Sequence, residues 1–171
     1  MASGDTLFEL FPLGSIPTTT AAATIDFISD GSTVVGQIPV LDFAGATADE
    51  HAEWVVLVPS HYAGGGLTFE IRYAPAGTVT NAVQFELRAD KIVDDELITG
   101  HDLQGQTATD ITDTPNGTAN DLHVTSTGAI THSNAGSPAV SDLLRIRLSR
   151  DYDHAGNADD AQVIAVYVTE T

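Results

Sequence analysis

The sequence predicts an all-β fold, an antiparallel two-sheet β-sandwich of the jelly-roll type. Segments with strand character recur about every ten residues and are separated by Gly, Pro, Asn, Asp and Thr. The clearest of them, Leu67–Ala74, alternates apolar and polar residues without a break, which indicates a strand with one face on a core and one in water. Helical periodicity is scarce. Many short strands around a single core are most economically arranged as a jelly roll.

The expected strands are, in chain order, Leu7–Phe11, Ala23–Ile28, Ile38–Phe43, Glu53–Val58, Leu67–Ala74, Ala82–Ala89, Gln106–Ile111, Asp121–Ser126, Leu143–Arg150 and Gln162–Thr169. Two segments have weak helical character: Ala46–Ala52 predicts one short turn, and Asp90–Ile98 predicts one or two turns.

The alternation of apolar and polar residues also predicts which side chains point into the core. Val83, Phe85 and Leu87 are expected to point inward, and the apolar residues of Leu143–Arg150 likewise. The run Trp54–Val58 is apolar throughout, which predicts burial on both faces, inside the sandwich or under a neighbouring subunit.

The chain of 171 residues predicts one folded unit, with residues 1–22 as an N-terminal strand and extended arm and residues 23–171 as the sandwich. Cysteine is absent, so disulfides and thiolate chemistry are excluded. No apolar run reaches the ~18 residues of a membrane span, and the first residues do not have the pattern of a signal peptide. We therefore expect synthesis in a cytoplasm and no membrane partner.

The charge balance is extreme, with 24 acidic against 6 basic residues and a formal net charge of −18. Such a surface repels nucleic acid, which needs clustered Lys and Arg. Three explanations remain open: solvation in high salt, binding of divalent cations, and docking onto a basic partner. Because Asp is abundant and Lys91 is the only lysine, the composition favours adaptation to salt.

The sequence offers one candidate metal site. The six histidines are at least nine residues apart, so no pair has the spacing of a zinc motif. The loop that follows Arg150 opens with Asp-x-Asp and contains a Gly-Asn turn, so its oxygen ligands are able to converge on calcium; a solvated acidic loop is the alternative. The proposed calcium ligands are Asp151, Asp153, Asn157 and Asp159. No other cofactor is expected.

Motifs for catalysis are absent. The chain has no Gly-x-Ser-x-Gly elbow, and Gly64–Gly66 leads into a strand without the Lys-Ser/Thr of a phosphate loop. The single tryptophan, Trp54, is expected in the core or an interface rather than under a sugar ring. We therefore expect a protein without enzymatic activity.

Three stretches together resemble a family of small proteins encoded by tailed phages and environmental viruses. They are Glu53-x₅-Pro59-x₂-Tyr62-x-Gly64-Gly65-Gly66-Leu67-Thr68-x₂-Ile71-x-Tyr73, the run Asp142–Asp151 and the ending Asp160–Thr171. The resemblance implies a virion component, an oligomeric capsid decoration (cement) protein, expected as a homotrimer on the major capsid protein at the capsid surface and made in the host cytoplasm. The Asp content departs from the family and implies a halophilic or marine host.

Two further hypotheses remain beside this one. The alternative is a receptor- or glycan-binding knob of a head fibre or tail, which an aromatic-lined groove near Tyr62, Tyr152 or Tyr167 would favour. A hydrolase is the third, and it would need two facing carboxylates. For the oligomer, the residues expected at the interface, with burial in the core as the open alternative, are Phe8, Leu10, Phe11, Trp54, Val56, Val58 and Tyr62.

Overall fold

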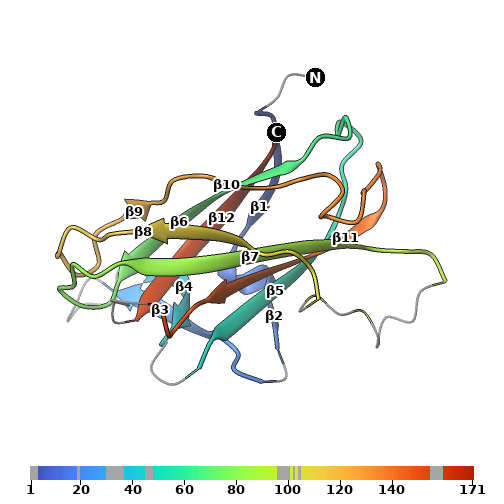
Figure 1. Cartoon of the computed structure of the whole chain (residues 1–171). Helices are drawn as coiled ribbons and strands as arrows, with labels where there is room; N and C mark the ends of the chain where they lie inside the picture. Colours follow the sequence, from blue (N-terminus) through green and yellow to red (C-terminus); the bar gives the residue numbers. More distant parts are fainter. Residues whose placement is uncertain are drawn as a thin grey trace.

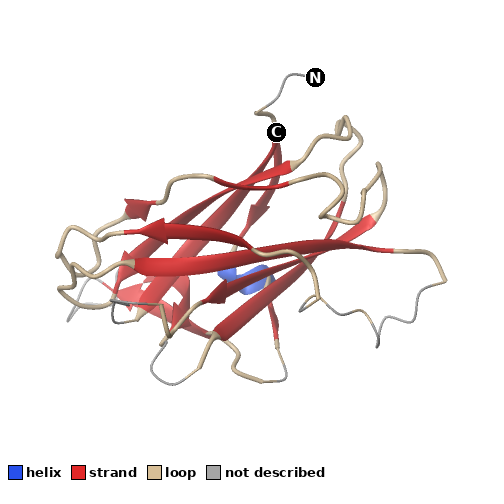
Figure 2. Cartoon of the chain, in the orientation of Figure 1, coloured by secondary structure: helices blue, strands red, loops and turns tan. Residues whose placement is uncertain are grey.

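A computed structural model describes residues 4–18, 20–29, 37–44, 48–95, 101, 103, 105–154 and 160–171. Two layers of antiparallel strands pack face to face, with one short 3-10 helix, η1 (Pro12–Gly14), beside them (Figures 1 and 2). Within the described residues no helix is long and apolar enough to cross a membrane.

The larger layer is a seven-stranded sheet whose main path runs β10–β6–β12–β4–β3, with β1 on β12 and β9 on β6. Its strands are β1 (Thr6–Leu10), β3 (Thr24–Ser29), β4 (Gln37–Phe43), β6 (Leu67–Pro75), β9 (His123–Val124), β10 (Gly128–Ile130) and β12 (Ala161–Glu170).

The smaller layer is a five-stranded sheet in the order β2–β5–β11–β7–β8. Its strands are β2 (Ile16–Pro17), β5 (Glu50–Leu57), β7 (Val83–Ile92), β8 (Thr109–Asp113) and β11 (Leu143–Arg150). Every strand pairing in both sheets is antiparallel.

All ten predicted strands occur, with ends shifted by up to three residues. Two further short strands, β2 and β10, were not predicted, because two or three residues carry no periodicity. The helical turns were wrong where the structure describes them: β5 already begins at Glu50, and β7 continues to Ile92. The remainder of both segments lies partly outside the described residues.

The core lies between the two sheets and is built from the inward residues that the alternation predicts. An aromatic cluster joins the layers: the ring of Phe85 contacts Tyr73 and Phe43 edge-on, with centroid distances of 5.4 and 6.3 Å. Phe43 and Phe85 come from opposite sheets, so this cluster fixes how the layers sit on one another.

The prediction that Trp54–Val58 is buried on both faces inside the sandwich is wrong, whereas burial under a neighbouring subunit stays a prediction. Trp54 and Val58 lie in the core, but Val55 and Leu57 are 41% and 60% exposed. They project from the outer face of the five-stranded sheet, where the described residues leave both of them open. The apolar run therefore marks a strand with an uncovered apolar stripe.

The N-terminal segment contributes to both layers. β1 pairs with β12 in the larger sheet, and β2 pairs with β5 in the smaller one. Between them Phe11 accepts a 3.1 Å hydrogen bond from the indole of Trp54. The boundary at residue 22 stays a prediction, but residues 6–17 are strands and turns of this same sandwich.

The triple-glycine turn closes around the end of the chain. The buried carboxylate of Glu170 accepts hydrogen bonds from the backbone N–H groups of Ala63 and Gly65, at 2.9 and 2.7 Å. A Cβ on Gly65 would stand 2.8 Å from the carbonyl oxygen of Thr171, and Gly64 has a φ of +95°. Glycine is required at these two positions for a tight turn and a close backbone approach.

Candidate functional site

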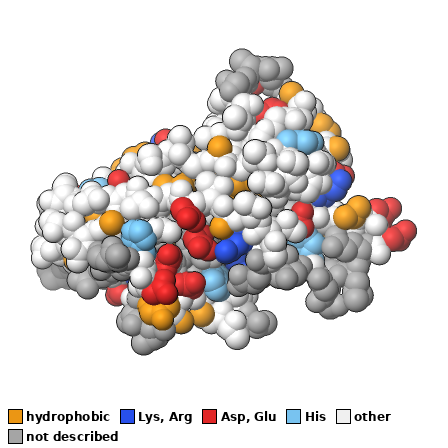
Figure 3. All heavy atoms as spheres, viewed as in Figure 1, with side chains coloured by type: hydrophobic (Ala, Val, Ile, Leu, Met, Phe, Trp, Pro, Cys, Tyr) orange, Lys and Arg blue, Asp and Glu red, His pale blue; other side chains and the backbone are white. Residues whose placement is uncertain are grey.

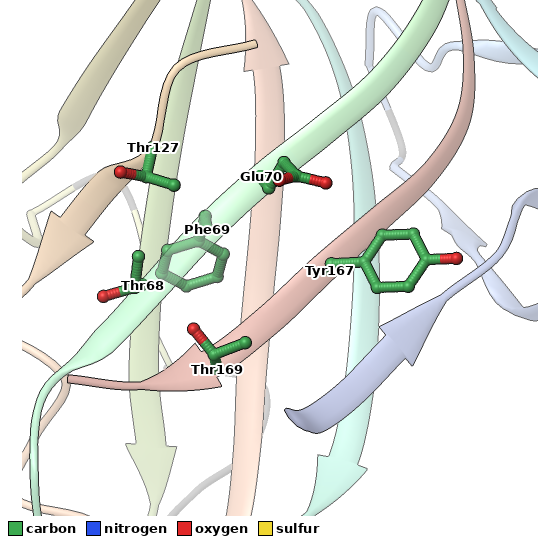
Figure 4. Close-up of a pocket in the computed structure, with 6 residues that line it drawn as sticks. All are labelled: Thr68, Phe69, Glu70, Thr127, Tyr167 and Thr169. Carbon is green, nitrogen blue, oxygen red and sulfur yellow. The ribbon is translucent and has the colours of Figure 1, made fainter. Parts of the chain in front are cut away.

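A shallow hollow lies on the outer face of the seven-stranded sheet, over β6, β12 and the segment before β10 (Figure 4). Its volume is about 170 Å³. The residues that line it are Thr68, Phe69, Glu70, Thr127, Tyr167 and Thr169.

The strand alternation places these side chains together. On β6 the core receives Phe69 and its odd-numbered neighbours, so Thr68 and Glu70 point outward. On β12 the outward positions include Tyr167 and Thr169. The register sets Tyr167 opposite Glu70 and Thr169 opposite Thr68, which makes two adjacent cross-strand pairs.

A row of contacts orders the polar groups at one side of the hollow. The guanidinium of Arg72 lies 4.2 Å from the centre of the Tyr167 ring, a cation–π contact. The same guanidinium donates from Nε and from Nη2 to the carboxylate of Glu70, both at 3.3 Å. The ring, the cation and the carboxylate therefore hold one another in place while remaining open to solvent.

The side chains of this hollow are of the kinds that can contact a polyol. Threonine and tyrosine hydroxyls donate and accept, the carboxylate accepts, and the ring offers an apolar surface. Glu70 is the only carboxylate among the lining residues. Hydrolysis of a glycosidic bond by the usual acid–base mechanisms uses two carboxylates, and the described lining residues supply one.

The three tyrosines that the sequence singled out have different environments. Tyr62 is buried, bonded through its hydroxyl to the carbonyl of Gly65, and stacked on His132. Tyr152 is 39% exposed and belongs to the acidic loop that follows Arg150. Only Tyr167 lines a hollow among those described.

The seven residues expected at an interface separate into core and surface. Leu10, Trp54, Val58 and Tyr62 lie in the core of the chain itself, which is the alternative left open above. Phe8 and Val56 pack partly against that core. Phe11 is 48% exposed. Whether any of them contacts a second copy stays a prediction.

The structure describes only two of the four proposed calcium ligands. Asn157 and Asp159 lie outside the described residues. Asp151 lies near Asp153 and Asp49, and burial together with the neighbouring Asp153 raises the pKa of Asp151. Within the described part of the chain no three His, Asp or Glu side chains are grouped closely enough to hold a metal. The four-ligand site stays a prediction.

The sequence indicated this site only in part. Its alternation correctly turned Glu70 and Arg72 outward, and Tyr167 was one of three candidate aromatics. What it did not give was the pairing of β6 with β12, which joins residues about 100 positions apart.

Comparison with known proteins supports the fold. No family model matches the chain, and no curated protein matches it. Among solved structures, a CBM35 of Abf62 from Cellvibrio japonicus aligns with a TM-score of 0.50 and 14% identity over 94% of this chain and 92% of that one. A family 35 carbohydrate-binding module from an environmental isolate aligns with a TM-score of 0.51 and 18% identity over 96% and 94%.

A third structure, the arabinose-bound α-L-arabinofuranosidase MgGH51, aligns with a TM-score of 0.50 and 12% identity. The alignment covers 91% of this chain but 23% of that enzyme. At these identities the likeness shows the fold alone. The chain is a β-sandwich of the jelly-roll type, as its sequence predicts.

Proposed function

We propose that this chain is a non-catalytic carbohydrate-binding β-sandwich that holds a glycan in the hollow around Tyr167. The observation that carries the proposal is the grouping, on one open sheet face, of an aromatic ring with a carboxylate, a guanidinium and three threonine hydroxyls. A sugar ring presents the complementary groups, namely hydroxyls around its edge and apolar C–H bonds on its faces.

The fold comparison points in the same direction. Two of the similar structures are carbohydrate-binding modules that this chain matches over nearly its whole length. Of the hypotheses drawn from the sequence, this likeness favours the glycan-binding alternative over the capsid decoration role. The viral origin, the homotrimer, the capsid partner and the virion location stay predictions.

The hollow sets the expected affinity. At about 170 Å³ it is smaller than a typical drug-sized pocket of ~300–1,000 Å³, so it contacts one or two sugar units. We therefore expect dissociation constants between about 10 µM and 1 mM, equivalent to roughly 4–7 kcal/mol.

Isothermal titration calorimetry against neutral oligosaccharides of arabinose, xylose and mannose tests the proposal. Tyr167→Ala is expected to weaken binding about tenfold, because it removes the ring and releases Arg72 from its contact. Tyr152→Ala is the matched control, because it removes an exposed tyrosine outside the hollow and should change affinity by less than about twofold. Equal losses in both variants would contradict this site, and no binding of any neutral glycan would contradict the function.

A further inference from the structure

A second recess lies on the opposite side of the molecule, along the outer face of the five-stranded sheet. It consists of two adjoining hollows of about 220 Å³ each that share Ile16, Glu53 and Arg145. We call these two hollows together the trough. The first hollow is also lined by Pro17, Thr18, Thr20, His51 and Arg147, and the second by Val55, Ile92 and His101.

Three charged side chains form the floor of the trough. Glu53, whose side chain is 6% exposed, accepts from Nε and Nη2 of Arg145 at 3.0 and 2.6 Å. On its other oxygen it accepts from Nε of Arg147 at 2.6 Å. Two guanidiniums against one carboxylate leave this triad with a net charge of +1.

That charge is unusual for this chain. The whole sequence carries a formal charge of −18, with only six basic residues. Figure 3, which looks onto the five-stranded sheet, shows a basic side chain beside acidic ones in the middle of this face. Burial, followed by the repulsion of Arg147, lowers the pKa of His51.

The two arginines differ in how many of their guanidinium nitrogens donate hydrogen bonds. Arg145 is bonded on all three nitrogens, to Glu53 and to the carbonyl oxygen of His101. Arg147 keeps Nη1 without a hydrogen-bond partner, although that atom is buried. A buried charged donor without an acceptor is costly, so a negative charge in the trough beside the Arg147 guanidinium would be stabilised.

The trough changes character along its length. His51, Glu53 and Val55 are alternate residues of β5, so they mark successive steps of about 6–7 Å along one face. The end at His51 and Arg147 is polar and includes two threonines. The end at Val55 and Ile92 is apolar, and Val55 is 41% exposed.

We propose that the trough binds a compact organic monocarboxylate, with its carboxylate at the Arg147 end and an apolar body about 6–7 Å long over Val55 and Ile92. A polyanion is disfavoured because the rest of the chain repels it. Inorganic phosphate or sulfate would leave the apolar end uncovered. A neutral sugar would find no Phe, Tyr or Trp ring among the described lining residues. This site is independent of the hollow at Tyr167.

Phenylacetate and phenylacetamide form a matched pair of probes, equal in shape and different in charge. In two-dimensional ¹⁵N NMR of the full chain, phenylacetate is expected to shift the amides of Thr18, Val55 and Ile92 and to saturate at about 1 mM, a value typical of a ligand of this size. Phenylacetamide should bind at least about tenfold more weakly, because it brings no charge to Arg147. Equal binding of the two, shifts confined to other residues, or no saturation would overturn the proposal.

Two variants locate the ends of the ligand. Arg147→Gln should weaken phenylacetate binding about tenfold, whereas Lys91→Gln, which removes a cation outside the trough, should change it less than about twofold. If Arg147→Gln does not fold, Val55→Asp tests the placement of the ligand instead. This variant alters an exposed residue and places a negative charge at the apolar end, so it should weaken phenylacetate binding. Unchanged phenylacetate binding in Val55→Asp would overturn the placement. None of these measurements uses a glycan, so failure here and failure of the proposed function remain distinguishable.

Discussion

The two outer faces of the sandwich carry the same chemical groups in opposite states of exposure. At the hollow, Arg72 and Glu70 form an ion pair whose side chains are 40% and 33% exposed. At the trough, Arg147 and Glu53 form one whose side chains are 11% and 6% exposed. Water screens the first pair and leaves it adjustable, so it contributes little to folding. The second pair has lost its water, so each partner depends on the other.

The difference teaches which charges are available for ligands. An exposed pair exchanges protein partners for ligand partners at little cost. A desolvated pair cannot be opened so easily, so the trough must offer a ligand its spare positive charge rather than its paired groups. On this basis the hollow should select hydroxyls and the trough should select a single anion.

Removing the central carboxylate of the trough is expected to have the largest effect. Glu53→Ala leaves two desolvated guanidiniums facing each other, which should cost about 3–5 kcal/mol of unfolding free energy in urea denaturation. Glu70→Ala is the matched control on the other face, with an expected cost below about 1 kcal/mol. Similar costs for the two variants would refute the contrast between the faces.

The second prediction concerns one acidic side chain that is partly buried among other acids. Asp42 lies on the outer side of β4, and burial, followed by repulsion from Asp160 and Asp26, raises its pKa from 3.8 to about 6. Its Oδ1 is buried without a hydrogen-bond partner. Because the folded state binds the proton more tightly than the unfolded state, this group destabilises the fold as pH rises from about 4 through 6.

We therefore expect the wild type to be more stable at pH 5 than at pH 7, by about 0.5–1 kcal/mol after allowing for solvent screening. Asp42→Asn should abolish most of that difference and raise stability at pH 7. Urea titrations of both proteins at the two pH values measure it. A wild type that gains stability between pH 5 and pH 7 would show that other groups dominate.

The sequence predicted the fold well because its signal is local. Alternation over eight or so residues, as in Leu67–Ala74, needs no knowledge of partners. The errors have physical causes. The exposed stripe at Val55 and Leu57 could not be distinguished from a doubly buried strand, because apolarity does not say what covers a residue.

The two sites were less accessible because they depend on register. Glu53 lies more than 90 residues before Arg145 and Arg147, and only the pairing of β5 with β11 brings them together. Nothing in the local pattern around Glu53 distinguishes it from the other acids of this acidic chain. In the same way, only the pairing of β12 with β6 places Tyr167 opposite Glu70.

The smallest expected change in stability belongs to Glu70→Gln, and it tests whether exposed groups are the ones reserved for ligands. The amide keeps the size and one acceptor oxygen but loses the charge that holds Arg72, so unfolding free energy should change by less than about 0.5 kcal/mol. Glycan affinity should nevertheless fall about threefold to tenfold, since hydrogen bonds to a charged acceptor are stronger than those to a neutral one. Parallel calorimetry and urea denaturation of this single variant measure both quantities. A variant that loses stability but keeps its affinity would assign Glu70 to the fold and move glycan binding away from the hollow.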